Sequence, residues 1–290
     1  MSHANEGAPA FRAPPLSCDA HFHVFGPAER YPVGGVNETL RYAPPLAPLP
    51  DYLALAKHLG IDRFVFIQPS AYGRDNSCML DAMRHMGVPR CRGIVDVDEH
   101  APDALLAGLD ALGVRGVRIN VSPVKPPDPG LSQTTRPRIE RLDARCFELG
   151  WHLDFLAPGW LTEELIPLFA KMKCSFSLAH MGMFKAEAGP TQPGFAKLLD
   201  ILRQGDGRCW VKLTGTYRMA TPPAYADAAP MVRALIDAAP GRLIWGSDYP
   251  HLSFADKVGS VQLFNLLADW ADAAERRRIL VDNPAKLFGF

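Results

Sequence analysis

Two histidines that are two residues apart, His21 and His23, interrupt a short apolar run near the start of the chain. Alternate side chains of a strand point to the same side, so both imidazoles would face one direction. Imidazoles that converge at the end of a strand can bind a metal ion or donate hydrogen bonds to a developing oxyanion. A pair of ordinary surface histidines is the alternative, and their spacing alone does not separate the two interpretations.

Two further chemical groups follow apolar runs much later in the sequence. His180 comes directly after the run 174–179, and Asp248 comes shortly after the run 242–245. Taken alone, a histidine in the position of His180 is more often structural, and Asp248 could equally cap the following helix. Together with the first histidine pair they would supply three imidazoles and one carboxylate, which can hold a cation or perform general-base chemistry. We therefore predict that His21, His23, His180 and Asp248 form the catalytic group.

Two arginines occur where a binding site for an anion would need them. Arg118 lies within an apolar run, so it requires an ion-pair partner or a substrate anion, and Arg218 follows the run 209–213. The planar guanidinium group matches the geometry of a carboxylate. Ser70 and Tyr42 can add hydrogen bonds, although serine in a turn needs no special cause. These residues predict a small anionic substrate.

The elements that must position these residues are eight short apolar runs, most of them followed by a helical pattern. Eight parallel strands that alternate with helices predict a single-domain (β/α)8 TIM barrel of the α/β class, and a doubly wound open sheet is the alternative. Active sites of this barrel lie at the C-terminal ends of the strands, which is where the candidate residues fall. The expected strands are 17–24, 63–67, 93–97, 116–120, 152–155, 174–179, 209–213 and 242–245, and the helices are 51–59, 75–85, 102–112, 137–149, 165–172, 195–202, 232–239, 256–270 and 272–289.

The length and composition of the chain exclude some kinds of partner and some locations in the cell. The 290 residues suit one barrel, and 31 basic residues balance 31 acidic ones, so neither nucleic acid nor an anionic membrane is an expected partner. Six dispersed cysteines suggest buried thiols in a reducing compartment. Residues 1–16 are polar and proline-rich without a signal-like apolar stretch, and no run approaches the roughly 18 apolar residues of a membrane span. We expect a cytoplasmic protein with a flexible N-terminus at 1–16, the barrel at 17–290 and a lid-like loop at 26–50; its oligomeric state stays open.

The sequence resembles the amidohydrolase superfamily, and within it the branch of lactone hydrolases that includes the pyrone dicarboxylate hydrolases. Six stretches carry the resemblance, and they follow the family's order over nearly the whole chain. The opening and closing stretches together are the most specific. The six stretches are Asp19–Pro27, Arg41–Pro44, Gln68–Ser70, Gly116–Asn120, Ala179–Gly182 and Trp245–His251.

The resemblance implies a barrel enzyme that opens a cyclic ester in the breakdown of aromatic or sugar acids. By the resemblance, the counterpart of Asp248 activates water and the counterparts of the three histidines surround the carbonyl under attack. The substrate-binding set that it implies is Tyr42, Ser70, Arg118 and Arg218, to which we add His251 from the closing stretch.

Two departures from the family pattern concern the substrate. A second arginine that the family has shortly after its strand-four arginine is missing here, where the chain reads Ser122-Pro-Val-Lys125. A tyrosine that the family has after strand five is replaced by Leu156. We therefore expect an anionic lactone, pyrone- or muconolactone-like, rather than the pyrone dicarboxylate itself.

The residues on strands four and five also indicate whether the site requires a metal ion. Binuclear sites of the superfamily have a lysine or glutamate on strand four and a histidine on strand five, where this chain offers Arg118 and Asp154. A cationic arginine would repel a second divalent ion. We predict that no metal is required, and the alternative is one Zn²⁺ on His21, His23, His180 and Asp248. The alternative functions are accordingly a mononuclear zinc-dependent amidohydrolase or decarboxylase, or a lactone isomerase.

Overall fold

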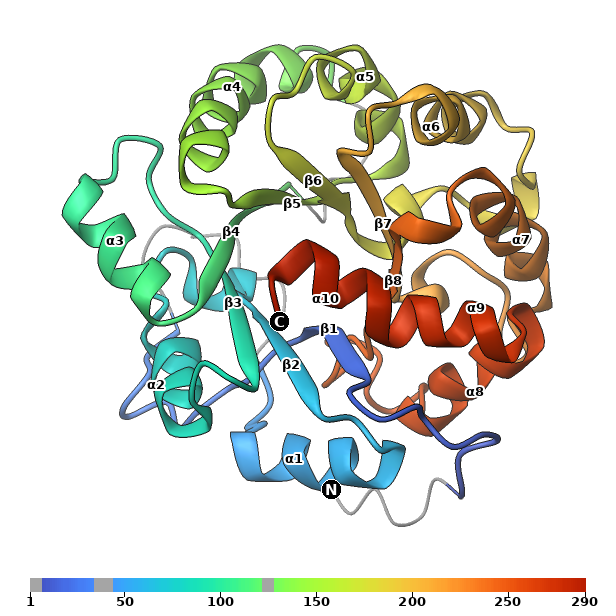
Figure 1. Ribbon diagram of the computed structural model, residues 1–290, viewed down its shortest axis with the longest axis horizontal. Helices are drawn as coiled ribbons and strands as arrows, with labels where there is room; N and C mark the ends of the chain where they lie inside the picture. The colour runs from blue at the N-terminus through green and yellow to red at the C-terminus, as the bar shows by residue number, and fades with distance from the viewer. Residues whose placement is uncertain (1–6, 34–43, 122–127) are drawn as a thin grey trace. The chain divides into compact units, whose positions relative to one another are not determined.

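The computed structural model describes residues 7–33, 44–121 and 128–290. Its eight strands form one sheet whose order follows the chain from β1 to β8, with helices between successive strands (Figure 1). This is the predicted (β/α)8 barrel. The strands are β1 Cys18–Phe22, β2 Arg63–Ile67, β3 Cys91–Val95, β4 Val114–Asn120, β5 His152–Leu156, β6 Ser175–Leu178, β7 Cys209–Leu213 and β8 Leu243–Trp245.

The helices that follow the strands bury the apolar stripes that the sequence predicted. Helix α1, for example, buries Tyr52, Leu55 and Leu59, and Gly60 ends it in the left-handed conformation, with a φ of 77°. The other helices are α2 Ser77–Met86, α3 Asp103–Ala111, α4 Leu131–Leu149, α5 Gly159–Phe169, α6 Pro193–Gln204, α7 Ala229–Ala238, α8 Ser260–Trp270, α9 Ala273–Arg277 and α10 Asn283–Phe288, and α1 itself spans Leu49–Leu59.

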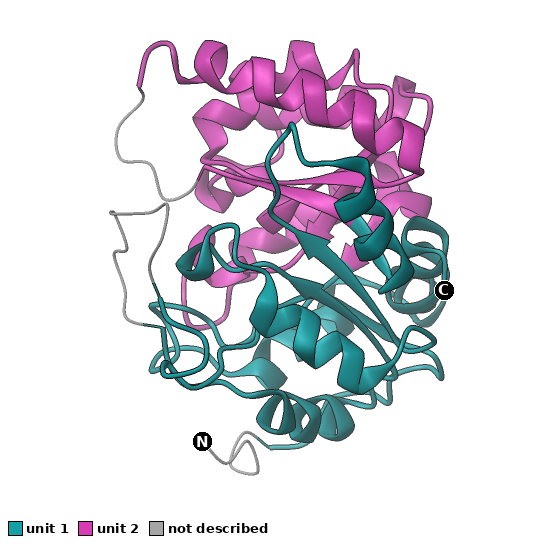
Figure 2. Cartoon of the chain, turned by 90° about the vertical axis from the view of Figure 1, so that its left-hand side faces the viewer, with its two compact units in different colours: residues 1–115, 245–290 teal, residues 116–244 magenta. Residues whose placement is uncertain are grey.

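The chain divides into two compact units, which Figure 2 colours separately. Unit 1 comprises residues 1–115 and 245–290, and unit 2 comprises residues 116–244. In unit 1, Phe22 of β1 stacks on Tyr52 of α1 with ring centroids 3.7 Å apart. In unit 2, Phe169 of α5 packs on Phe176 of β6 at 5.0 Å. Each unit therefore has its own aromatic contacts between strands and covering helices.

The end of the chain covers the N-terminal ends of two strands in unit 1. Arg92 of β3 donates hydrogen bonds to the carbonyl of Phe288 at 3.0 Å and to that of Gly289, which follows α10. The ring of Phe290 lies under the guanidinium groups of Arg63 and Arg92, at 5.2 and 4.5 Å. Both arginines lie within the first two residues of their strands, so α10 and the residues after it cover the N-terminal ends of β2 and β3. The C-terminal ends of these strands remain available for the site.

Three predicted helices differ clearly in their bounds from the structure, and one of them is α5, which spans Gly159–Phe169 and not 165–172. Helix α4 begins at Leu131 and not at 137, and Pro137 lies inside it. The segment 131–136 is exposed or half-buried, so it carries no apolar stripe that a periodicity could reveal. The stretch 272–289, predicted as one helix, divides at a π-helical turn, Arg278–Asp282, into α9 and α10.

The N-terminal segment and the long loop are described in part. Phe11 stacks on Phe264 of α8 at 4.5 Å, and the amide of Ala10 donates to Asn265 Oδ1 at 2.7 Å. Residues 1–6 lie outside the described part, and the flexibility of the segment stays a prediction. In the loop 26–50, residues 34–43 also lie outside it, Tyr42 among them, so the lid stays a prediction too.

Two expectations about the environment of the protein can be compared with the structure. In the part of the chain that is described, no helix combines the length and the apolar character that a membrane crossing requires. All six cysteines lie in the described part of the chain, where each is buried and none forms a disulfide. Their burial agrees with the expectation that they serve as small apolar side chains.

Candidate active site

Three of the predicted catalytic side chains meet in unit 1. His21 Nε2 lies 3.5 Å from Asp248 Oδ1, and His23 Nε2 lies 3.8 Å from the same oxygen. The two imidazole rings stand edge to face, with centroids 5.2 Å apart. All three residues are buried. The i, i+2 spacing on β1 thus directs both rings towards one carboxylate, as the alternation of a strand requires.

A backbone carbonyl at the end of β2 defines which ring nitrogen of His23 carries a proton. His23 Nδ1 lies 2.8 Å from the carbonyl oxygen of Ile67, at the end of β2. A carbonyl oxygen only accepts hydrogen bonds, so Nδ1 is the protonated nitrogen. In the neutral ring Nε2 then presents a lone pair towards Asp248. This tautomer suits a metal ligand or an acceptor for water, and a second proton on Nε2 would make the ring cationic.

The chain after β8 turns back against β1. The amide of Asp248 donates to the carbonyl of His21 at 2.8 Å, and the amide of His23 donates to that of Tyr249 at 2.8 Å. Asp248 has a φ of 59°, and His251, which donates its amide to Asp248, has the same value. Left-handed backbone is unfavourable for residues with a Cβ, by roughly 1–2 kcal/mol each. The two hydrogen bonds to β1 stabilise a turn that its own sequence disfavours.

Asp19 joins the two segments and was not among the predicted site residues. Its Oδ1 accepts the amides of His21 and Ser247, both at 3.0 Å, and its Oδ2 accepts the hydroxyl of Tyr52 at 2.9 Å. Burial raises the pKa of this carboxyl to about 6, although the hydrogen bonds from Ser247, His21 and Tyr52 act in the opposite direction. The signal in the sequence was its position two residues before His21, on the same face of the strand.

Gly246 is required by the close approach of the two segments. A Cβ at this position would lie 2.5 Å from the Cβ of His21 and 2.7 Å from its backbone nitrogen. Real side chains do not approach this closely, so only glycine lets the chain after β8 lie against β1. The same applies in unit 2, where a Cβ on Gly215 would lie 2.3 Å from His180 Nδ1. A glycine thus lies against one predicted catalytic histidine in each unit.

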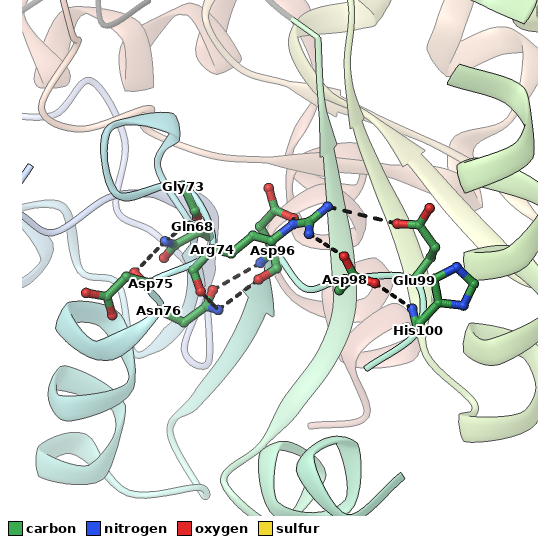
Figure 3. A network of polar contacts seen from close by, with 9 residues as sticks. All are labelled: Gln68, Gly73, Arg74, Asp75, Asn76, Asp96, Asp98, Glu99 and His100. Carbon is green, nitrogen blue, oxygen red and sulfur yellow. Dashed lines mark hydrogen bonds and ion pairs between the residues drawn. The ribbon is translucent and has the colours of Figure 1, made fainter. Parts of the chain in front are cut away.

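Two predicted substrate-binding residues also lie in unit 1. Ser70 lies in the loop after β2 and begins the helical turn Ser70–Tyr72. Two amide side chains hold this loop in place, as Figure 3 shows. Gln68 Nε2 donates to the carbonyl of Asp75 at 2.8 Å, and Asn76 Nδ2 donates to that of Asp96 at 2.8 Å. His251 Nε2 is 2.8 Å from the hydroxyl of Ser260, the first residue of α8. That contact anchors His251 and leaves its substrate role a prediction.

Unit 2 contains a buried group of charges on the inner face of its strands. Asp154 of β5 is fully buried, and its Oδ1 lies 2.8 Å from Lys212 Nζ and accepts the hydroxyl of Ser177 at 2.7 Å. Arg118 Nη1 lies 4.0 Å from the other oxygen. Burial acts to raise the pKa of Asp154, but Lys212 and then Arg118 outweigh it and lower the pKa to about 2. Asp154 therefore stays ionised and fixes the position of Arg118.

The other predicted residues of unit 2 are His180 and Arg218. His180 follows β6 in a left-handed turn, with φ 52° and ψ 46°, and Met181 continues it at φ 51°. The guanidinium of Arg218 lies 5.0 Å from the ring centroid of Tyr217 and donates to its hydroxyl at 3.1 Å. His180 lies just beyond the end of β6 and Arg218 lies in the loop after β7, as predicted, and their contacts hold them in defined positions.

The donor set of unit 1 fits one divalent cation. A ligand atom from each of His21, His23 and Asp248 lies within 4.8 Å of the others. The hydrogen bond from His23 Nδ1 to a carbonyl is the usual support for an imidazole ligand. Asp154, the strand-five residue, is instead engaged by Lys212 and lies close to Arg118, so it is poorly suited to a second ion.

A (β/α)8 barrel with imidazoles on its first strand and a carboxylate after its last one is an arrangement suited to hydrolysis. The chain belongs to the amidohydrolase family, whose model, described as Amidohydrolase, matches residues 18–290.

Several of its relatives are named as lactone hydrolases, and one, 28% identical over 97% of this chain, is named as a D-galactarolactone isomerase from Agrobacterium fabrum. A 4-sulfomuconolactone hydrolase from Hydrogenophaga intermedia is 37% identical, over 96% of this chain and 90% of that protein. A 2-pyrone-4,6-dicarboxylate hydrolase from Comamonas testosteroni is 31% identical, over 99% and 94%. A solved structure from Pseudomonas putida, named as a candidate 2-pyrone-4,6-dicarboxylic acid hydrolase, is 33% identical with a TM-score of 0.81, and covers 94% of this chain and 97% of its own.

Replacement of Gly246 by alanine should displace His21 from Asp248. The added Cβ would overlap β1, so we expect the free energy of unfolding to fall by about 1–3 kcal/mol. A small displacement of a reacting group can cost up to about 100-fold in rate. We expect kcat/KM to fall roughly 10- to 100-fold. The matched control is Gly241→Ala, because nothing lies within 4 Å of a Cβ there. Equal activity of the two variants would contradict the packing argument.

The buried Asp154 predicts a specific dependence of stability on pH. Its pKa is about 2 in the folded protein and about 3.9 in an unfolded chain, so its ionised form contributes roughly 2–3 kcal/mol above pH 4. That contribution is lost as the pH falls from about 4 to 2. In urea unfolding at pH 7, the free energy of unfolding should be clearly higher for wild type than for Asp154→Asn. The difference between the two should narrow as the pH falls. Asp237→Asn, on the surface of α7, should change stability little, and a pH-independent gap for Asp154→Asn would refute the assignment.

Proposed function

We propose that this protein hydrolyses a lactone that carries an anionic substituent, in the breakdown of aromatic or sugar acids. The observation that carries the proposal is the buried Asp248 carboxylate beside the imidazoles of His21 and His23. A carboxylate in this setting is a suitable general base for water. The names of the relatives support the choice of a lactone over other esters and amides.

In the proposed reaction Asp248 accepts a proton from water while the water oxygen attacks the lactone carbonyl. The tetrahedral intermediate then collapses, and the bond between the carbonyl carbon and the ring oxygen breaks. The proton held by Asp248 passes to the departing ring oxygen, which restores the carboxylate. The product is an open-chain acid that contains one additional water molecule.

The histidines are proposed to stabilise the negative charge on the carbonyl oxygen. A well-placed donor to an oxyanion can be worth about 3–4 kcal/mol. For His23 to donate through Nε2, its ring must be cationic, because Nδ1 already donates to Ile67. The carboxylate of Asp248, 3.8 Å away, favours that charge. His21 and His180 are the other proposed donors.

Arg118 and Arg218 are proposed to bind the anionic substituent of the substrate. Asp154 and Tyr217, respectively, restrict the positions of these two guanidinium groups. A preordered guanidinium loses less conformational entropy when it binds a carboxylate or a sulfonate. Leu156, half-buried at the end of β5, favours an apolar part of the ring at that point. Tyr42 lies outside the described residues, and its role stays part of the proposal, together with the cytoplasmic location.

We further propose that the reaction does not require a resident metal ion. The sequence supports this for a binuclear site, since Arg118 and Asp154 stand where such sites of the superfamily have other residues. His21, His23 and Asp248 are nevertheless the residues that would hold one divalent ion. The chemistry that such an ion would supply is acidification of a bound water molecule.

The function is tested with a panel of lactones that carry one or two carboxylates or a sulfonate. Wild-type protein should release acid from at least one of them at neutral pH, and the product mass should increase by one water. Asp248→Asn should reduce kcat by at least about 1000-fold while circular dichroism and melting temperature stay close to wild type.

The exposed Asp256→Asn is the matched control for Asp248→Asn and should retain full activity. A product with unchanged mass would indicate a lactone isomerase and overturn the proposal. Near-wild-type turnover by Asp248→Asn would instead remove that residue from the role of base while leaving hydrolysis intact.

Metal analysis separates the proposed mechanism from the zinc-dependent alternative. Purified protein is expected to contain well under one metal ion per chain, and prolonged dialysis against a chelator should leave kcat unchanged. Stoichiometric zinc, with activity that is lost on its removal and restored on its return, would refute the metal-free mechanism. His23→Asn provides a second measurement, because it should leave the metal content unchanged only if no ion is bound.

A further inference from the structure

Thr214 directly follows β7 and has not entered the site so far. Alternate residues of a strand face the same side, and Lys212, two residues earlier, extends to Asp154 on the inner face of β5. Thr214 therefore faces inward as well, one step nearer to the C-terminal end. Asn120 and Leu156, which are register partners on β4 and β5, stand two residues beyond Arg118 and Asp154 in the same way. These three residues form the next layer above the buried charges of unit 2.

The hydroxyl of Thr214 is buried and has no hydrogen-bond partner among the described residues. The residue is 2% exposed, and no described group lies within hydrogen-bonding reach of its Oγ1. A buried hydroxyl that makes no hydrogen bond is unfavourable by about 1–3 kcal/mol. Valine has the same shape and would avoid this penalty. A hydroxyl that the described residues leave unsatisfied at this position has a physical reason to be present if a ligand satisfies it.

The neighbours of Thr214 are residues already proposed for the reaction. The next residue is Gly215, on which the ring of His180 lies. Gly215 has a φ of 59°, and it turns the chain into the segment Thr216–Arg218, which ends with the predicted anion-binding arginine. The hydroxyl thus belongs to the short segment that positions both His180 and Arg218, beyond the C-terminal ends of β6 and β7.

We propose that the Thr214 hydroxyl is a substrate-binding group that donates a hydrogen bond to an oxygen of the lactone. This inference rests on the proposed function and adds a residue to it. Bound substrate would supply the acceptor that the protein does not. The hydroxyl then discriminates in favour of a ligand with an oxygen at this point, because an analogue without one leaves the donor unsatisfied.

Two substitutions at this position separate a binding role from a structural one. Thr214→Val keeps the shape and removes the hydroxyl, so kcat/KM for the best lactone should fall roughly tenfold or more. The melting temperature should stay the same or rise, because an unsatisfied polar group has been removed. Thr214→Ser keeps the hydroxyl, and its kcat/KM should remain within about threefold of wild type.

Thr135→Val is the matched control. The hydroxyl of Thr135 donates to the carbonyl of Leu131 at 2.7 Å within α4, so its removal should lower the melting temperature and leave kcat/KM unchanged. The two valine variants are thus expected to have opposite effects. A Thr214→Val variant with wild-type kcat/KM, or one whose loss of activity comes with an equal loss of stability, would overturn the inference. Failure of Thr214→Ser to restore activity would overturn it as well.

The outcome is distinguishable from a failure of the proposed function. If wild-type protein opens no anionic lactone, the proposed function fails before any variant is compared. If wild-type protein is active and Thr214→Val is equally active, the function stands and only the role of Thr214 is refuted. If Thr214→Val is less active than wild type, the parameter that changes locates the hydrogen bond. A change in kcat places it at the reacting ester, and a change in KM places it elsewhere on the substrate.

Discussion

The carboxylate of Asp19 is the contact on which the geometry of unit 1 depends. It accepts the amides of His21 and Ser247 on one oxygen, so it joins two segments that are more than 200 residues apart in the sequence. The amide of Asp248 adds a direct bond to β1. Together these contacts determine how far the carboxylate of Asp248 lies from the imidazoles. Burial raises the pKa of Asp19 to about 6, so this arrangement retains a carboxyl group whose charge is unfavourable in the folded state.

The sequence predicted much of this arrangement because it depends on local patterns. Apolar runs of strand length predicted the eight strands, and the barrel followed from their number and from the helices between them. The i, i+2 spacing of His21 and His23 predicted that both rings face one side, and the position of Asp248 after the last run predicted that it meets them. Each of these inferences needs only the periodicity of a strand and the closure of a barrel.

The remaining features depend on contacts that no local pattern encodes. Lys212 was not among the predicted site residues, yet it forms a buried pair with Asp154 beside Arg118, which requires three strands in a particular register. The closeness of Gly246 to His21 depends on the distance between two backbones, which composition does not reveal. The start of α4 was missed because its first turns are not buried, and burial is what produces an apolar periodicity.

The site concentrates features that a protein selected for stability alone would avoid. His180 and Asp248 are in left-handed backbone, Asp19 is a desolvated carboxyl group, and Asp154 requires two cations to remain charged. Each is unfavourable where it stands, and each is held by hydrogen bonds or close packing from neighbouring strands. Rigid strands can support such positions because the barrel core, not the site, supplies the favourable burial. The unsatisfied hydroxyl of Thr214 follows the same rule, since its missing partner is one that a bound molecule can provide.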